Sequence, residues 1–468
     1  MIAAVALLAL MVTAGAATGQ KPGAAPPADR ETDPLVLRKL EWFQDLKFGL
    51  MMHWGPYSQW GVVESWTLCS EDEPWCRRTI PDYCEYKRRY EALPKTFNPV
   101  KFDPERWAEA AARAGMRYVV FTTKHHDGFC MFDTKRTDYK ITGADVPFHA
   151  HPKADVTRAI FNAFRAKGFG VGAYFSKADW HSPDYWAPEW ATPDRNVNYK
   201  IARYPERWEK FKAFTFSQIE ELMTGYGPVD ILWLDGGWVS PANGQDIDMA
   251  KIAAMARGRQ PGLIIADRTV GGRYENYQTP EQQIPGKPLD GPWETCMTMA
   301  GQWSYNPKDV YKPARDIIRM LVEVVAKGGN YLLNIGPSPE GELPAESLAR
   351  LEEIGAWMEV NGRALYGTRP IPPYGEGKVR YASLRDGTVF AFYVAEAGEE
   401  VPPAEVRLAS LRPKPGTKVS MLGCAENVHW ESAEAGAILR VPASAVAAPP
   451  CRHIWVFQFS SQGEPPHS

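Results

Sequence analysis

Residues 104–129, "PERWAEAAARAGMRYVVFTTKHHDGF", decide how this chain is expected to fold. The first part, residues 104–115, predicts a helix, with proline at its first position and glycine at its end. The second part, residues 118–126, is an apolar β-forming run that ends in two histidines. A helix followed by a strand with polar residues at its end is the repeating unit of a parallel α/β structure.

The same unit recurs along the chain. Further strands are predicted at 47–55, 168–176, 229–237, 262–268 and 330–337, and further helices at 155–168, 205–225, 246–258, 313–328 and 345–361. Strands that alternate with helices imply right-handed crossovers and a parallel sheet. Over residues 34–368 this pattern favours a (β/α)8-like TIM barrel, the catalytic domain, above an open doubly wound sheet.

The helical pattern disappears after about residue 370. Residues 379–394, "VRYASLRDGTVFAFYV", predict a hairpin that turns at Asp386-Gly387, and "HIWVFQF" at 453–459 predicts a late strand. We therefore expect residues 369–468 to form an all-β sandwich domain.

The N-terminus, "MIAAVALLALMVTAGAATGQK", has the pattern of a secretory signal peptide over residues 1–19, followed by a flexible leader over 20–33. It lacks a basic first region, so an uncleaved anchor is the alternative. The sequence predicts a secreted or periplasmic protein that has no membrane contact after cleavage. Export permits disulfides: Cys69, Cys76 and Cys84 are expected to form a local bridge or remain thiols, and Cys424 and Cys451 could form a second bridge.

Composition narrows the class of partner. The net charge is −3 and no block of lysine and arginine occurs, which argues against nucleic acid or an anionic membrane. The chain has 17 tryptophans, whose faces suit the apolar sides of sugar rings.

Polar residues end several of the predicted strands, at the rim that carries the active site in a barrel. They are His53, His125, His126, Tyr174, Asp235 and Arg268. Imidazoles suit the recognition of hydroxyl groups, because each ring offers a donor and an acceptor. A metal site at the histidine pair is the less favoured interpretation, since adjacent strand residues point to opposite faces.

Four motifs in order, "FGLMMHWGPYS", "FTTKHHDGF", "ILWLDGGW" and "WETC", resemble the α-L-fucosidases of glycoside hydrolase family 29 over about residues 35–370. The resemblance implies a retaining exo-glycosidase that removes terminal α-L-fucose from fucosylated glycans and needs no cofactor. By the same resemblance Asp235 is the nucleophile and His53, His125 and His126 bind fucose. Trp66, Tyr174 (or Phe175), Trp233 and Arg268 line the sugar pocket. Asp127 is the runner-up catalyst, although with Gly128 it most simply turns the chain.

The reaction needs a second carboxyl group, about 5 to 5.5 Å from the nucleophile, to protonate the leaving group. The resemblance assigns this acid/base role to Glu281, on the loop after Arg268, with Glu275 and Glu294 as competitors. If Glu294 is not the acid, it is expected to support the sugar pocket or the acid. Asp235 should stay ionised, because Arg268 and the histidines favour a carboxylate.

One motif departs from the family. Where many relatives have Glu-Trp, this chain has Glu64-Ser65-Trp66, so Glu64 either reaches the sugar by a one-residue shift or loses that contact. Two other functions stay open at this point. One is a related retaining glycosidase for another sugar, such as an α-galactoside, and the other is a catalytically silent fucose-binding protein.

Overall fold

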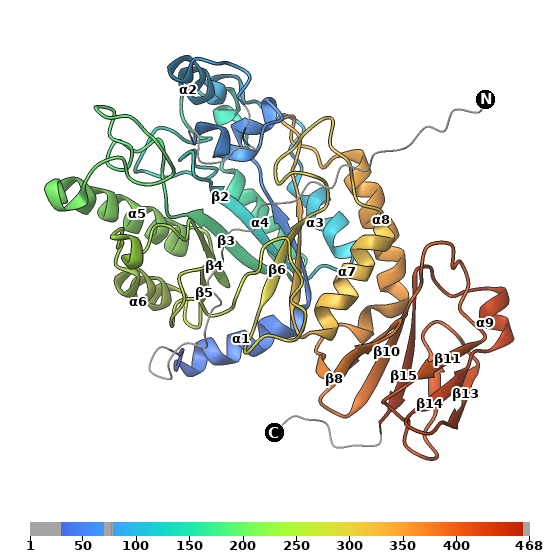
Figure 1. Ribbon diagram of the computed structural model, residues 1–468. Helices are drawn as coiled ribbons and strands as arrows, with labels where there is room; N and C mark the ends of the chain where they lie inside the picture. Colours follow the sequence, from blue (N-terminus) through green and yellow to red (C-terminus); the bar gives the residue numbers. More distant parts are fainter. Residues whose placement is uncertain (1–29, 70–75, 77, 462–468) are drawn as a thin grey trace, which may run out of the picture.

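The computed structural model of the chain describes residues 30–69, 76 and 78–461. Figure 1 shows parallel strands surrounded by helices, with a second, antiparallel part beside α7 and α8. The expected signal peptide and most of the expected leader lie outside the described residues. Within those residues, no helix is long and apolar enough to cross a membrane.

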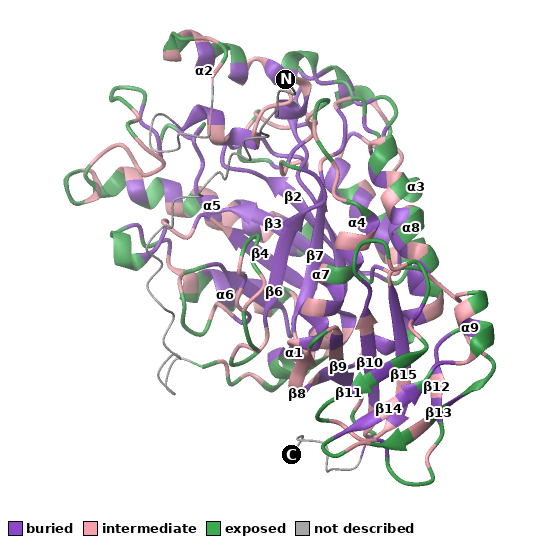
Figure 2. Cartoon of the chain, turned by 45° about the vertical axis from the view of Figure 1, so that its right-hand side comes forward, coloured by how far each residue is buried: buried purple, intermediate pink, exposed green. Residues whose placement is uncertain are grey.

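The first part is built on seven parallel strands in the order β5-β4-β3-β2-β1-β7-β6. Their bounds are β1 (Phe48–Met52), β2 (Tyr118–Lys124), β3 (Gly170–Ser176), β4 (Ile231–Asp235), β5 (Ile264–Asp267), β6 (Glu294–Thr298) and β7 (Asn330–Ile335). The strands are buried almost throughout, as Figure 2 shows, because helices cover the outside of the sheet. Strand β6, "ETCMT", was not among the predicted strands because it lacks an apolar run.

Helices follow the strands as the sequence predicts. They are α3 (Pro104–Arg113), α4 (Val156–Ala166), α5 (Pro205–Gly225), α6 (Met249–Arg259), α7 (Ala314–Ala326) and α8 (Ala345–Asn361). Asp103 and Asp155 cap α3 and α4 by accepting a hydrogen bond from the backbone three residues on. Three helices were not predicted: α1 (Pro34–Leu46), α2 (Tyr83–Glu91) and the short α9 (Ala443–Ala447) in the part expected to be all-β. Short 3-10 helices are η2 (Pro56–Gln59), η3 (Glu64–Leu68), η4 (Leu93–Thr96), η5 (Pro147–Ala150), η6 (Ile201–Arg203), η7 (Pro241–Asn243) and η8 (Gly362–Ala364).

The gap between β5 and β6 is filled by an irregular stretch, residues 275–282, which we call the closing segment. Single bridges join it to both neighbours: Glu275 pairs with Ala266 of β5, and Glu281 pairs with Cys296 of β6. Backbone bonds such as Gln282 N to Cys296 O (3.0 Å) fasten it further. The closing segment thus stands where the eighth strand of a barrel would lie.

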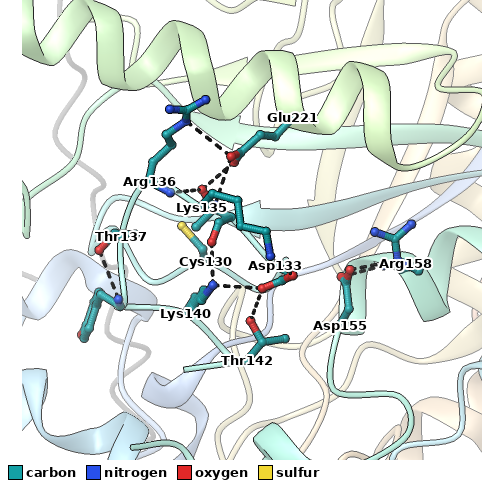
Figure 3. A network of polar contacts seen from close by, with 12 residues as sticks. Cys130, Asp133, Lys135, Arg136, Thr137, Lys140, Thr142, Asp155, Arg158 and Glu221 are labelled. Carbon is teal, nitrogen blue, oxygen red and sulfur yellow. Dashed lines mark hydrogen bonds and ion pairs between the residues drawn. The ribbon is translucent and has the colours of Figure 1, made fainter. Parts of the chain in front are cut away.

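The long connection after β2 is fixed by acidic side chains, as Figure 3 shows. Asp133 accepts hydrogen bonds from Lys140 (2.9 Å), Thr142 (2.7 Å) and Lys135 (2.6 Å). Glu221 of α5 accepts a hydrogen bond from the backbone of Lys135 (3.0 Å). These contacts anchor the connection that begins with His125 and His126.

The C-terminal part is one antiparallel sheet in the order β11-β14-β13-β12-β15-β10-β9-β8. Its elements are β8 (Arg369–Glu376), β9 (Val379–Ser383), β10 (Thr388–Val394), β11 (Glu405–Leu408), β12 (Val419–Met421), β13 (Asn427–Ser432), β14 (Ala437–Arg440), α9 (Ala443–Ala447) and β15 (Ile454–Ser460). Residues from both ends of this order, among them Tyr381 and Leu439, share one buried cluster. The two halves of the sheet therefore pack face to face as a sandwich.

Two details of this part differ from or extend the predictions. Cys424 and Cys451 do not form the disulfide bridge that the sequence allowed. Instead the Cys451 thiol lies 3.3 Å from the Ile454 carbonyl oxygen. On the barrel side, the indole of Trp357 in α8 donates to the same carbonyl (2.9 Å), so the two parts are in direct contact.

Candidate active site

A pocket of about 750 Å³ opens at the carboxyl ends of the parallel strands. Eight of the residues predicted from the sequence line it: His53, Glu64, Trp66, His125, Trp233, Asp235, Arg268 and Glu281. Trp238 and Trp303 also line it and had not been assigned a role. The rim of the barrel therefore gathers residues from distant parts of the chain, as the rule for barrel active sites requires.

Asp235, the last residue of β4, is held from three sides. One carboxylate oxygen, Oδ1, accepts from Arg268 (2.9 Å) and from the backbone of Gly236 (2.8 Å), and Oδ2 accepts from the Tyr174 hydroxyl (2.6 Å). Burial alone would raise the pKa of Asp235, but the Arg268 charge and the hydrogen bond from Tyr174 outweigh it and keep the pKa well below its ordinary value. Asp235 is thus an ionised, fixed carboxylate at the pocket.

Arg268 also binds Glu281. Its Nη1 donates to Asp235 and its Nη2 to Glu281 Oε2 (2.7 Å). The Glu281 side chain is 45% exposed, whereas that of Asp235 is 17% exposed. One guanidinium group therefore lies between two carboxylates, one facing solvent and one enclosed.

The three predicted histidines form a buried group beside Asp235. His125 and His126 have ring centroids 4.2 Å apart, and His53 lies 5.4 Å from His125. Burial lowers the pKa of His53 and of His126 to about 4, and it holds the pKa of His125 well below its ordinary value. The imidazoles are consequently neutral near pH 7, and each ring offers one hydrogen-bond donor and one acceptor.

At residues 64–66, where the motif departs from the family, Glu64 lines the pocket. Glu64 has φ of +27°, which an L-residue rarely adopts, and its carboxyl group lines the pocket while accepting from Ser304 N (2.8 Å). Burial raises the pKa of Glu64 to about 8, so the group is a protonated donor at neutral pH. Ser65, the additional residue, turns its hydroxyl to His125 Nδ1.

Aromatic rings form the inner wall. Tyr174 stacks on Trp233 with centroids 5.2 Å apart, and Arg268 lies 4.4 Å from the Trp233 ring. The neighbouring Phe175 faces Lys124, whose Nζ is 4.2 Å from its ring centroid. Between the two alternatives, it is therefore Tyr174 and not Phe175 that reaches the site.

Three acidic residues considered from the sequence lie elsewhere. Glu294, expected in substrate binding, is fully buried behind the pocket, where it accepts from Trp233 Nε1 (3.0 Å) and the Tyr118 hydroxyl (2.6 Å). Glu275 instead accepts from the backbone of Thr269 (3.2 Å) and Gly271 (2.7 Å). Asp127 accepts from the Tyr90 hydroxyl (2.9 Å). Of the acidic candidates, Glu281 alone shares Arg268 with Asp235.

Sequence reasoning missed two polar residues that touch the histidines. Ser176, the last residue of β3, contacts His126, and Asn334 of β7 contacts His53. Both stand at or near a strand end, so the rule that selected Asp235 could have found them.

His125, His126 and Asp235 also offer ligand atoms within 4.8 Å of one another, a geometry that could hold a metal ion. Arg268 already places a positive charge 2.9 Å from the Asp235 carboxylate, which opposes a second cation there.

Comparison with known proteins agrees with this geometry. The sequence profile described as alpha-L-fucosidase matches residues 17–363. The chain belongs to the α-L-fucosidase family. The tissue alpha-L-fucosidase of Mus musculus is 28% identical over 439 residues, which cover 90% of this chain and 91% of the mouse protein. The resemblance inferred from the sequence is thereby confirmed.

Solved structures of the α-L-fucosidase family share the fold. Alpha-L-fucosidase isoenzyme 1 from Paenibacillus thiaminolyticus has a TM-score of 0.74 and 30% identity, covering 92% of this chain and 100% of that one. An α-L-fucosidase from Bacteroides thetaiotaomicron, solved as a trapped covalent intermediate, has a TM-score of 0.73 and 25% identity, covering 95% and 99%. The predicted barrel and sandwich are confirmed, and the family is one of retaining glycoside hydrolases.

Proposed function

We propose that this member of the family is a secreted exo-α-L-fucosidase that hydrolyses terminal α-L-fucose from fucosylated glycans through a covalent intermediate on Asp235. The observation that carries the proposal is the enclosed, ionised Asp235 paired through Arg268 with the more exposed Glu281. A retaining glycosidase needs two such carboxyl groups with different environments.

In the first step, a carboxylate oxygen of Asp235 attacks the anomeric carbon and the bond to the leaving oxygen breaks. Glu281 gives its proton to that oxygen, and the product is a fucosyl ester of Asp235. In the second step, Glu281 takes a proton from water, the water oxygen attacks the anomeric carbon, and the ester bond breaks. Two displacements at one carbon release the sugar with its original anomeric configuration.

The surrounding residues have separable tasks. His53, His125 and His126 are neutral and bind sugar hydroxyls, and Glu64, protonated near neutral pH, donates to another. Trp233 lines the pocket and offers apolar surface to the sugar ring, and the fully buried Tyr174 stacks on it.

Asp235→Ala should reduce kcat/KM for an aryl α-L-fucoside by at least about a thousandfold, because the covalent step is lost. Thermal melting would show that the variant is folded. The wild-type reaction, followed by proton NMR, should release α-L-fucose before mutarotation. Release of the β anomer, preference for the matching α-galactoside, or an active Asp235→Ala variant would each refute the proposal.

Glu281→Ala should also lose turnover, but azide should restore part of it on an activated aryl fucoside, because the aryl group leaves without an acid and azide attacks the fucosyl intermediate without a general base. Glu275→Ala is the matched control, since its carboxylate binds backbone amides and not Arg268. Rescue of Glu275→Ala instead of Glu281→Ala would reassign the acid.

Secretion is proposed from the N-terminal apolar run. Expression of the full chain should yield protein outside the cytoplasm that begins near residue 20, as mass spectrometry of the N-terminus would measure. A cell-associated, uncleaved chain would indicate the anchor alternative.

A further inference from the structure

The hydrogen on the His126 ring can be assigned from its neighbours. His126 Nδ1 lies 2.7 Å from Ser176 Oγ, and that hydroxyl lies 2.7 Å from the Ala178 carbonyl oxygen. A carbonyl oxygen only accepts and a hydroxyl has one hydrogen, so Ser176 donates to Ala178. His126 Nδ1 must then carry a hydrogen and donate to Ser176.

The same logic applies to His53. Its Nδ1 lies 2.8 Å from Asn334 Oδ1, and the Asn334 amide nitrogen lies 2.6 Å from the Trp303 carbonyl oxygen. The amide nitrogen must face that carbonyl, because two oxygens would repel, so the amide oxygen faces His53. His53 Nδ1 is therefore also a donor.

A neutral imidazole carries one hydrogen, so a donating Nδ1 leaves Nε2 as an acceptor. His126 Nε2 lies 3.8 Å from Asp235 Oδ2, which is an acceptor too. Only a group that donates a hydrogen bond can pair with His126 Nε2 at this position. For His125 the choice is open, since the Ser65 hydroxyl could donate to its Nδ1 or accept from it.

We infer that Ser176 and Asn334 are positioning residues that fix His126 and His53 as hydrogen-bond acceptors, and that the pocket therefore requires a fucosyl residue whose hydroxyls at these two histidines are free to donate. A sulfate, ester or ether at either oxygen removes the hydroxyl hydrogen that would be donated to the histidine and adds bulk among buried groups. The inference rests on the proposed function and deepens it by naming the substrate class, an unsubstituted terminal fucose.

The ring hydrogens can be measured without any reaction. In protein labelled with ¹⁵N at histidine, NMR near pH 7 should show Nδ1 of both rings protonated and Nε2 unprotonated, with signals assigned from His53→Gln and His126→Gln variants. A hydrogen on Nε2 of either ring would overturn the inference, even in an active fucosidase.

Binding of modified sugars tests the consequence. We would measure dissociation constants of L-fucose and of analogues in which one ring hydroxyl is replaced by hydrogen, fluorine or O-methyl. At the positions that contact the two histidines, the fluoro analogue should bind no better than the deoxy analogue, because fluorine cannot donate, and the O-methyl analogue should bind at least about tenfold more weakly than fucose. A fluoro analogue that binds better than its deoxy counterpart at every position would refute the inference.

Ser176→Ala should raise KM for an aryl fucoside about tenfold while changing kcat less, because His126 is then free to turn its hydrogen toward the pocket. Thr123→Val is the matched control: it also removes a buried hydroxyl bonded to a carbonyl, that of Tyr174, but contacts no histidine. Equal KM values for Ser176→Ala and Thr123→Val would contradict a positioning role for Ser176.

Discussion

Asp127 follows the two active-site histidines, yet its carboxyl group binds the Tyr90 hydroxyl of α2 and the backbone of Phe129. Burial raises the pKa of Asp127 to about 7, and the nearby Asp179 adds to this effect. Asp127 is 2% exposed, so ionisation of its carboxyl group destabilises the folded state and not the unfolded state. At the scale of one residue, the group stabilises the loop only when it is protonated.

Asp127→Asn should therefore change how stability depends on pH. Between the ordinary pKa near 3.8 and the folded value near 7, only the folded protein binds the proton, so the wild type loses up to about 1.4 kcal/mol per pH unit as pH rises, and the variant does not. The free energies of unfolding of both proteins would be measured with urea from pH 4.5 to 8. Relative to the wild type, Asp127→Asn should gain stability as the pH rises to 7, and the difference should then stay constant.

Asp133→Asn supplies the control. Lysine and threonine hydrogen bonds outweigh the effect of burial and hold the pKa of Asp133 below its ordinary value, so its contribution is lost only below the ordinary pKa, outside this pH range. A pH-independent difference between wild type and Asp127→Asn would exclude the buried-acid explanation.

At the scale of an element, the turn after β2 depends on Gly128. It has φ of +77°, and a Cβ placed there would lie 2.2 Å from Asp179 Oδ1. Asp179 cannot give way easily, because it forms a buried ion pair with Lys124 (3.0 Å). The turn and the ion pair together hold His125 and His126 at the rim.

Gly128→Ala should lower the free energy of unfolding by more than about 1 kcal/mol and reduce kcat/KM, because the histidine-bearing turn must shift. Gly168→Ala is the control for backbone strain without a clash, since Gly168 has φ of +80° but nothing lies within 4 Å of the added carbon. It should cost about 1 kcal/mol with kcat/KM unchanged. Similar stability and activity in the two variants would show that the contact with Asp179 has no role.

The secondary-structure element that carries a site residue decides whether that residue could be predicted from the sequence. Asp235 could be predicted as a site residue because it ends an apolar run, which places it on the rim of the barrel. Glu281 was reached only through resemblance, because the closing segment has neither helical nor strand periodicity. The pocket-facing Glu64 depends on an unusual φ, and the roles of Ser176 and Asn334 depend on partners from other strands, none of which a single sequence displays.

At the scale of the whole molecule, barrel and sandwich share one buried surface. Residues of β10 and β15, such as Phe390, Phe392 and Val456, belong to the same apolar cluster as α7 and α8. Trp357 of α8 lies at this junction, 2% exposed and bonded to Ile454 O. The sandwich thus covers helices that would otherwise present apolar faces to water.

Trp357→Ala should lower the free energy of unfolding by about 3 to 5 kcal/mol, the usual cost of removing a buried indole. Calorimetry should show barrel and sandwich unfolding in one transition for the wild type. Two well-separated wild-type transitions would contradict a shared core, and a loss below about 1 kcal/mol would show that Trp357 is not central to it.

The closing segment, which carries Glu281, should tolerate changes in length that the strand carrying Asp235 would not. The proposed nucleophile, Asp235, ends β4, and a one-residue insertion in a strand would reverse the faces to which its side chains point. The proposed acid, Glu281, is carried by an irregular stretch joined to the sheet through backbone hydrogen bonds, followed by a connection, residues 283–293, without helix or strand. Length changes there need not disturb the strands, so leaving-group preference can be remodelled by loop grafting while the bond-forming carboxylate stays in place.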